Sequence, residues 1–389
     1  MKPGGLRIET IRAKELESFF SDYVKQAASQ QISPISQYRA ISQSKNPYAD
    51  DSDVGLLVAY SGELCVGYQG VLPGILRTPR GDHKVYWGTA AYVLPEFRKR
   101  MVAIQLIKKL VALKRDIVLT GFEKIVADVF KGLHFREVGP LEYITVRPDR
   151  LVFASFPFRR FYRLQKRWPA LRKMSESALK LSRKYSYPVL RDAFHKSLSS
   201  RADKAIHGIK WRELNNVNPF CLNGSGASEK SPSFPREAAA INWMLDYPWI
   251  REGPPPTRPA YYFSESYNQF RNIVLDITDA DGKSGGFVVL SLVVEKDESK
   301  LKVLDHHCIE ENCATMFQLV CKQAARFKAD VIELPLGFKE QAKLLPFASL
   351  VMKQEQRRYL CHPSSPDSPL AEAIGNLTLD LSDGDCAFT

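Results

Sequence analysis

The sequence predicts an α+β fold (α/β elements in three layers) with two mixed-sheet domains joined by a basic helical connector. First, an apolar strand at 85–94 gives way to a helix whose apolar residues recur at helical spacing from Met101. Second, the order strand, strand, strand, helix, strand, helix, strand occurs twice. Third, a basic segment separates the two occurrences. The expected boundaries are 1–148, 149–222 and 223–389.

The stretch 85–114 carries the first functional signal. Its apolar strand is interrupted at Pro95, and the basic residues 98–100 come directly before the helix. The first-turn amides of a helix lack intrahelical acceptors, and its dipole is positive at that end. A basic turn that leads into a helix N-terminus therefore predicts an anion site, most naturally for a phosphate or a pyrophosphate.

The segment VLPEFRKRMVA at 93–103 resembles the strand, loop and helix that bind the acyl-CoA pyrophosphate in GNAT N-acyltransferases. The family pattern is Arg or Gln, two residues, Gly, one residue, then Gly or Ala, and here Met101 stands at the Gly. The flanks are also similar over about 140 residues. A hairpin pattern at 54–72 precedes the segment, and Phe130 and His134 stand at the Tyr and Gly of the family's Tyr-x-x-Leu-Gly-Phe corner.

This resemblance implies acetyl-CoA or another acyl-CoA as co-substrate, and no metal is expected. It implies that the coenzyme is held by Tyr92, Val93, Leu94, Arg98, Lys99, Arg100, Met101, Val102 and Ala103. Strand amides at 92–94 would bind the oxyanion of the reaction. Tyr86, Tyr92 and Glu96 are the candidates for the catalytic acid or base, although each also suits a structural role.

The second domain lacks the basic turn. Its corresponding strand ends at His306, His307 and Cys308, and Glu310 and Glu311 follow at the start of the helix. Acidic side chains at a helix N-terminus repel a pyrophosphate. We therefore expect the coenzyme on the first domain, with the second forming the acceptor groove or an interface.

The seven cysteines form no C-x-x-C pair and are odd in number, which predicts reduced thiols. The spacing of the histidine and cysteine residues at 306–321 fits no common zinc pattern.

The connector carries the basicity of the chain. Residues 147–212 contain 18 Lys or Arg against four acids, within a total net charge of +12. Pro157, Pro169 and Pro188 each precede helix-compatible residues, which predicts up to three helices with Pro near the first turn. Three interpretations stay open: a docked linker, an anionic membrane surface bound through 150–212, and, less favoured, nucleic acid.

The sequence contains no run of about 18 apolar residues, and the N-terminus lacks the apolar region of a signal peptide. We expect a cytoplasmic protein, which the basic connector could place at the inner face of the membrane.

Tandem GNAT architecture occurs in proteins encoded with surface-polysaccharide pathways and in Fem-type aminoacyltransferases. The resemblance thus implies an N-acyltransferase with a small-molecule or glycan acceptor, such as an amino sugar or a cell-envelope precursor. A Fem-like tRNA-dependent aminoacyltransferase and a non-catalytic adaptor are the alternatives. In the GNAT fold the N-terminal helix and the loop to Asp53 form the acceptor side. Gln37, Tyr38, Arg39 and Tyr48 lie there without an assigned role.

Overall fold

The computed structural model describes residues 5–26, 29–122, 124–154, 171–217, 231–254, 260–278, 284–296, 298–308 and 312–388. The chain divides into two compact units built from interleaved segments. Unit 1 comprises Met1–Leu141, Asn216–Phe270 and Gln356–Thr389, and unit 2 comprises Glu142–Asn215 and Arg271–Glu355. The sequence predicted three successive segments instead, at 1–148, 149–222 and 223–389. The two divisions differ because each unit contains strands from both halves of the chain.

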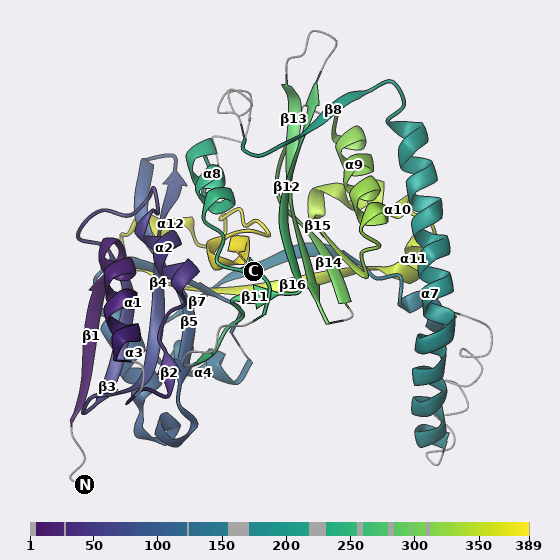
Figure 1. Cartoon of the computed structure of the whole chain (residues 1–389). Coiled ribbons are helices and arrows are strands. Elements are labelled where there is room, and N and C mark those ends of the chain that lie inside the picture. Colours follow the sequence, from purple (N-terminus) through teal and green to yellow (C-terminus); the bar gives the residue numbers. More distant parts are fainter. Residues whose placement is uncertain are drawn as a thin grey trace. The chain divides into compact units, whose positions relative to one another are not determined.

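Unit 1 is built on a mixed sheet in which the strand order is β1-β3-β4-β5-β6-β16. The strands β1, β3, β4 and β5 are antiparallel neighbours, β6 is parallel to β5, and β16 is antiparallel to β6. The main elements of unit 1, shown in Figure 1, are β1 (Leu6–Arg12), α1 (Leu16–Lys25), α2 (Gln37–Ser44), β3 (Val54–Ser61), β4 (Leu64–Thr78), β5 (Gly81–Val93), η3 (Pro95–Arg100), α3 (Val102–Val111), β6 (Asp116–Thr120), α4 (Lys124–Gly132), α8 (Ala238–Asp246), α12 (Pro369–Ala373) and η7 (Gly384–Phe388).

Strand β3 shows why this unit has three layers. Successive side chains of a strand point to opposite faces. Leu57 and Ala59 lie in the core that contains the apolar side of α3. Leu56 and Val58 lie in a second core, with the apolar side of α1. Helices therefore cover both faces of the sheet, as the sequence predicted.

Unit 2 repeats this order with β8-β12-β13-β14-β15-β7, and β14 and β15 form its parallel pair. The helix between the two parallel strands is α3 in unit 1 and α9 in unit 2. The predicted internal repeat is thus confirmed. The elements of unit 2 are α5 (Arg150–Ala154), α7 (Leu171–Ala205), β8 (Lys210–Leu214), β12 (Gln269–Thr278), β13 (Ser284–Glu295), β14 (Glu298–Cys308), α9 (Cys313–Arg326), β15 (Val331–Pro335), η6 (Leu336–Phe338), α10 (Lys339–Lys343) and α11 (Ala348–Val351).

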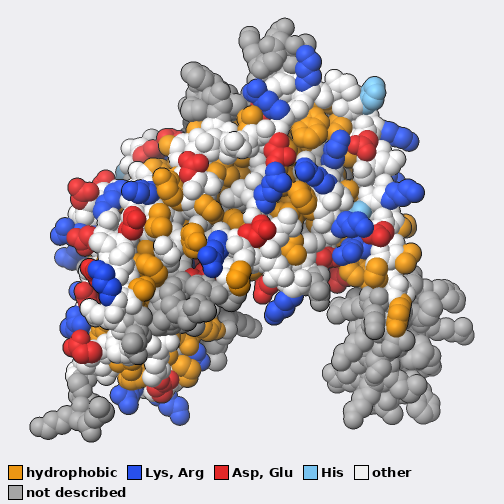
Figure 2. Space-filling view, in the orientation of Figure 1, with side chains coloured by type: hydrophobic (Ala, Val, Ile, Leu, Met, Phe, Trp, Pro, Cys, Tyr) orange, Lys and Arg blue, Asp and Glu red, His pale blue; other side chains and the backbone are white. Residues whose placement is uncertain are grey.

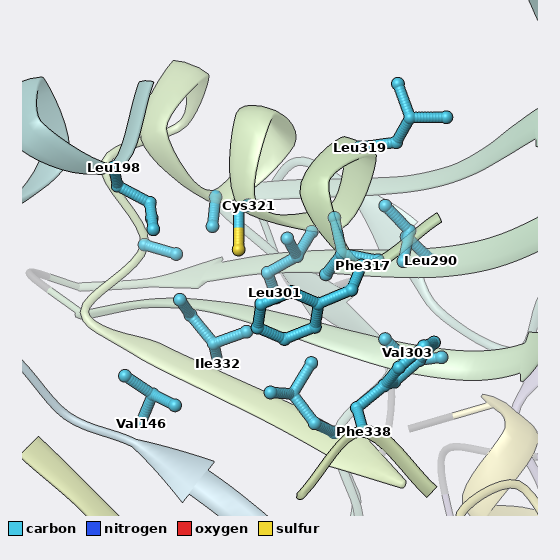
Figure 3. Close-up of a cluster of buried hydrophobic side chains, with 14 of the residues drawn as sticks. Val146, Leu198, Leu290, Leu301, Val303, Phe317, Leu319, Cys321, Ile332 and Phe338 are labelled. Carbon is cyan, nitrogen blue, oxygen red and sulfur yellow. The ribbon is translucent and has the colours of Figure 1, made fainter. Parts of the chain in front are cut away.

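The core of unit 2 lies between its sheet and the helices α7 and α9. Phe317 and Cys321 of α9 point toward Leu301 of β14 and Ile332 of β15, with Leu198 of α7 beside them (Figure 3). All five side chains are at most 3% exposed. The sequence predicts a helix at 312–328, and α9 confirms it, with its apolar residues packed in this core.

Two strands close the sheets differently from what the sequence predicted. We expected 141–146 to close the first sheet and 350–361 to form a closing pair in the second. Instead, β7 (Arg136–Val146) pairs through Tyr143–Val146 with β15 in unit 2, and β16 (Met352–His362) is one strand that pairs through Tyr359–His362 with β6 in unit 1. The apolar pattern identifies a strand but not its partner, because any sheet edge with an apolar face offers equivalent backbone hydrogen bonds.

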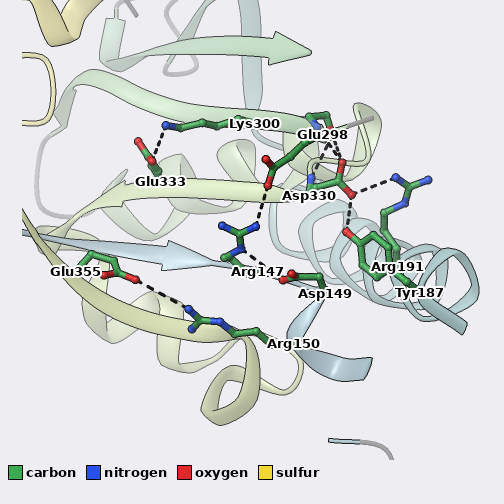
Figure 4. A network of polar contacts seen from close by, with 11 residues as sticks. Arg147, Asp149, Arg150, Tyr187, Arg191, Glu298, Lys300, Asp330, Glu333 and Glu355 are labelled. Carbon is green, nitrogen blue, oxygen red and sulfur yellow. Dashed lines mark hydrogen bonds and ion pairs between the residues drawn. The ribbon is translucent and has the colours of Figure 1, made fainter. Parts of the chain in front are cut away.

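Polar contacts dock α7 within unit 2 (Figure 4). Arg191 lies 3.1 Å from Asp330, and the hydroxyl of Tyr187 donates to the same carboxylate. Burial raises the pKa of Asp330, but hydrogen bonds from Tyr187, Ser299 and Arg191 outweigh it and hold this pKa below its ordinary value. Pro188 lies inside α7 rather than near a helix start, so that prediction was wrong. These contacts on both sides of Pro188 offset the lost backbone hydrogen bond.

Other cations of the basic segment are also paired within unit 2. Arg147 contacts Glu298 at 2.8 Å, and Arg212 contacts the buried Asp276 at 2.9 Å. On the face seen in Figure 2, Lys and Arg side chains are interspersed with Asp and Glu. Pro157, Pro169 and the aromatic residues of 155–170 lie outside the described residues. Membrane or nucleic-acid binding by this segment stays a prediction.

The prediction of reduced thiols was wrong for one pair. Cys308 and Cys313 form a disulfide with a Cα–Cα distance of 5.5 Å. The end of β14 and the start of α9 are brought together by the fold, which spacing alone does not reveal. Cys65, Cys321, Cys361 and Cys386 are buried and form no disulfide.

Within the described residues, no group of three or more potential metal ligands is found. The helices described there include none with the length and apolarity needed to cross a bilayer.

Candidate active site

The predicted anion site lies at the junction of η3 and α3 in unit 1. Met101 is the N-cap residue that precedes α3, with φ of 60° and ψ of 17°, the left-handed conformation that favours Gly. Its side chain is 55% exposed, so more than half of it faces solvent. Met101 thus reproduces the backbone conformation expected of a Gly at this position, at a cost of about 1 kcal/mol.

The first turn of α3 supplies hydrogen-bond donors. The helix begins at Val102 with no side chain capping it, and the amide of Gln105 donates to the carbonyl of Met101 at 3.0 Å. The amides of the residues at 102–104 precede that bond and therefore have no acceptor within the helix. They add to the positive end of the helix dipole, which stabilises an anion.

Arg98, Lys99 and Arg100 are all exposed around this helix start. The Nε of Arg98 donates to the carbonyl of Val93 at 3.2 Å, and the guanidinium of Arg100 lies 4.7 Å from the ring centre of Phe97. Three cations and a helix N-terminus therefore occupy one short segment, as the sequence predicted.

Strand β5 loses its parallel neighbour just before this segment. It pairs with β6 only from Val85 to Gly88, while its pairing with β4 continues to Val93. A β-bulge interrupts the latter pairing at Ala90, which has a φ of 39°. After Gly88, therefore, β5 remains paired with β4 along one edge but is no longer paired with β6 along the other.

The strand amides differ in their availability. The amide of Leu94 donates to the carbonyl of Val66 at 3.0 Å and is therefore occupied. Because successive residues of an antiparallel strand direct their amides to alternate edges, the amide of Val93 points to the other edge. The contact of Arg98 with the Val93 carbonyl agrees with this direction. Of the three amides predicted at 92–94, Val93 is the one that can serve as an oxyanion donor.

The candidate acid and base residues lie in three different environments. Tyr86 is 3% exposed and donates to Asp53 at 2.9 Å. Burial and this hydrogen bond raise the pKa of Tyr86, which suits a structural role. Tyr92 is half-buried and stacks on Tyr262 at 4.1 Å, and Glu96 is exposed in η3. The catalytic roles assigned to these residues stay predictions.

A cavity of about 170 Å³ in unit 1 was not predicted. It is lined by Ser36, Arg39, Ala90, Trp249, Ile250, Tyr261, Phe263, Ser264, Tyr267 and Asp385. Ala90 places this cavity at the bulge of β5. The sequence could not reveal it, because the residues come from three segments of the chain. The one available signal was the position of Arg39 in the region that the resemblance assigns to the acceptor.

The corresponding position in unit 2 differs. Cys308 at the end of β14 is joined to Cys313 at the start of α9, and the side chain of Asn312 donates to the carbonyl of Gly285 at 3.0 Å. Glu310 and Glu311 lie outside the described residues. The described part of this junction carries no Lys or Arg, in contrast to η3 of unit 1.

Replacing Met101 by Gly tests the strain at the helix start. We expect Met101→Gly to raise the free energy of unfolding by about 0.5 to 1 kcal/mol, because Gly adopts positive φ without a Cβ clash. Ala103→Gly is the matched control. It is exposed on the same helix turn and should lower stability by up to about 1 kcal/mol. Urea denaturation measures both, and equal destabilisation by the two substitutions would contradict a strained Met101.

No protein-family model and no curated protein matches this sequence. Among solved structures, it is similar to a GCN5-related N-acetyltransferase from Anabaena variabilis, with 12% identity, a TM-score of 0.50, and coverage of 92% of this chain and 73% of that one. A GCN5-related N-acetyltransferase from Kribbella flavida has 13% identity, a TM-score of 0.47, and coverage of 92% and 70%.

A tandem GNAT protein from the clavulanic acid biosynthesis pathway has 10% identity, a TM-score of 0.45, and coverage of 94% and 100%. Of these three, the Anabaena structure alone reaches a TM-score of 0.5, and at this identity the likeness concerns the fold. The likeness to the Anabaena structure and the repeated strand order of the two units together show that the chain has a tandem GNAT-type fold.

Proposed function

We propose that this protein is an acyl-CoA-dependent N-acyltransferase whose coenzyme binds on unit 1. The observation that supports this most directly is the start of α3, where first-turn amides, a left-handed Met101 and three exposed cations lie beside the end of β5. An amino sugar or a cell-envelope precursor is the acceptor that we propose from the tandem architecture.

The residues at this position fit a pyrophosphate. The amides at 102–104 can donate to phosphate oxygens, and Arg98, Lys99 and Arg100 can balance the charge. Met101 has the left-handed backbone conformation that lets a pyrophosphate approach the helix start, and its exposed side chain points largely to solvent. The junction of β14 and α9 in unit 2 lacks the cations, so one coenzyme per chain is the expected stoichiometry.

The chemistry that acyl-CoA supplies when bound is a thioester carbonyl that an amine can attack. The new C–N bond forms as the C–S bond breaks, the amine loses a proton, and the thiolate gains one. The amide of Val93 would donate to the carbonyl oxygen as it becomes negative. Tyr92 precedes Val93 in the sequence and Glu96 follows it. We propose these two side chains as the candidates for proton transfer.

Native mass spectrometry of the freshly purified protein tests this function. We expect one retained CoA or acyl-CoA per chain, and its mass would identify the acyl chain. A steady-state assay of CoA release with a panel of amines should then show turnover. Retention without turnover for any amine would favour a non-catalytic adaptor. If the protein retains no CoA species and also fails to bind added acetyl-CoA, the proposal is contradicted.

A further inference from the structure

Arg39 is a buried cation beside the cavity in unit 1. It is 5% exposed and lies in α2, where the side chain of Ser36 caps the helix by accepting from the Arg39 amide at 3.3 Å. This cap fixes the first turn of α2. The guanidinium is thereby held at the cavity that Ser36 also lines.

The contacts of the Arg39 guanidinium are neutral in the part of the chain that the structure describes. Its Nη1 donates to the hydroxyl of Tyr261 at 3.0 Å, and its Nη2 donates to the hydroxyl of Thr89. The third contact is the ring of Trp249, whose centre lies 3.8 Å from the guanidinium carbon. Hydroxyl groups and an aromatic ring attract a cation but do not neutralise its charge.

A buried charge is costly unless an opposite charge compensates it. Here the guanidinium borders a cavity, so an anionic group could enter and form a charge-assisted hydrogen bond with it. Tyr261 accepts the bond from Arg39 and can use its own proton to donate to the same anion.

The cavity borders β5, the strand that also carries the proposed oxyanion donor Val93, although Val93 itself does not line it. Ala90 of the β5 bulge lines it, and Thr89, which contacts Arg39, is the preceding residue of the same strand. Its volume of about 170 Å³ is below the roughly 300 Å³ at which pockets for drug-sized ligands begin. Asp385 also lines the cavity, and its carboxylate acts electrostatically on the Tyr261 hydroxyl that Arg39 contacts.

We propose that this cavity binds the acceptor and that the acceptor is a small amine bearing an anionic group, a carboxylate or a phosphate, which Arg39 recognises. This inference rests on the proposed function and names the substrate class of the same site. It predicts that a neutral amine of similar size is a poorer acceptor, because it would form no charge-assisted hydrogen bond with the guanidinium.

Matched acceptor pairs test this inference. We would measure kcat/KM for α-amino acids against their α-amides, and for glucosamine 6-phosphate against glucosamine, with acetyl-CoA and the full-length protein. In at least one pair, kcat/KM should be tenfold or more higher for the anionic compound than for the neutral one. The pair that shows this difference identifies the recognised group as a carboxylate or a phosphate. Arg39→Met should abolish the preference, whereas Arg39→Lys should retain part of it because the charge stays.

A binding measurement separates this inference from the proposed function. Thermal shift with the same compounds, in the absence of acetyl-CoA, should show that anionic amines raise Tm in the wild type and in Arg39→Lys but not in Arg39→Met. Turnover that is equal for anionic and neutral amines would overturn the acceptor class and leave the acyltransferase intact. A shift in Tm without any acetyl-CoA binding would support the anion site and reject the transferase. Circular dichroism checks that each variant folds.

Discussion

The double variant Arg98→Glu, Arg100→Glu should bind acetyl-CoA at least about 100-fold more weakly than the wild type, because two charge-assisted contacts become repulsive. Both side chains are exposed, so the fold should be unaffected. Isothermal titration measures the affinity, and the loss should shrink as salt increases, because screening weakens contacts between exposed charges.

The matched control is Lys108→Glu, Lys109→Glu. These residues are exposed in the last turn of the same helix α3, so the net charge changes equally while the helix start is unaltered. We expect the control to bind acetyl-CoA within about threefold of the wild type. Equal weakening by both double variants would show that net charge, rather than the start of α3, governs binding. Unchanged binding by both would place the coenzyme elsewhere.

Acidification from pH 7.5 to pH 5 should destabilise unit 2 through His195 by about 2 kcal/mol. His195 is 3% exposed in α7, and burial, with a smaller contribution from Arg191, lowers its pKa from the ordinary 6.5 to about 4. In the unfolded chain the imidazole gains a proton below pH 6.5, whereas in the folded unit it stays neutral to about pH 4. The unfolded state therefore binds more protons in this window, and stability falls as pH falls.

His195→Leu removes this titration and should reduce the difference in unfolding free energy between pH 7.5 and pH 5 by the same amount. His207→Leu is the control, because His207 is exposed just beyond the end of α7. It should keep the pH dependence of the wild type. Urea denaturation followed by circular dichroism at the two pH values measures all three proteins. An unaltered pH dependence in His195→Leu would show that other groups are responsible.

The position of the basic turn before α3, where we propose that the coenzyme binds, could be predicted because its signal is local. A strand, a break at Pro95, three cations and a helix follow one another in the chain, and each affects its immediate neighbours. Apolar patterns predicted α3 and β3 for the same reason. Pro188 was misplaced because its helix is stabilised by Asp330, which lies far from it in sequence.

The sequence by itself determined the two copies of a strand and helix pattern and the basic helix start that distinguishes the first copy. The tertiary structure decided which unit each closing strand joins, the disulfide between Cys308 and Cys313, and the cavity around Arg39. The physical reason is range. Backbone propensity and side-chain period act over a few residues, whereas strand pairing, burial of a charge and the enclosure of a cavity depend on segments that meet only in the folded chain.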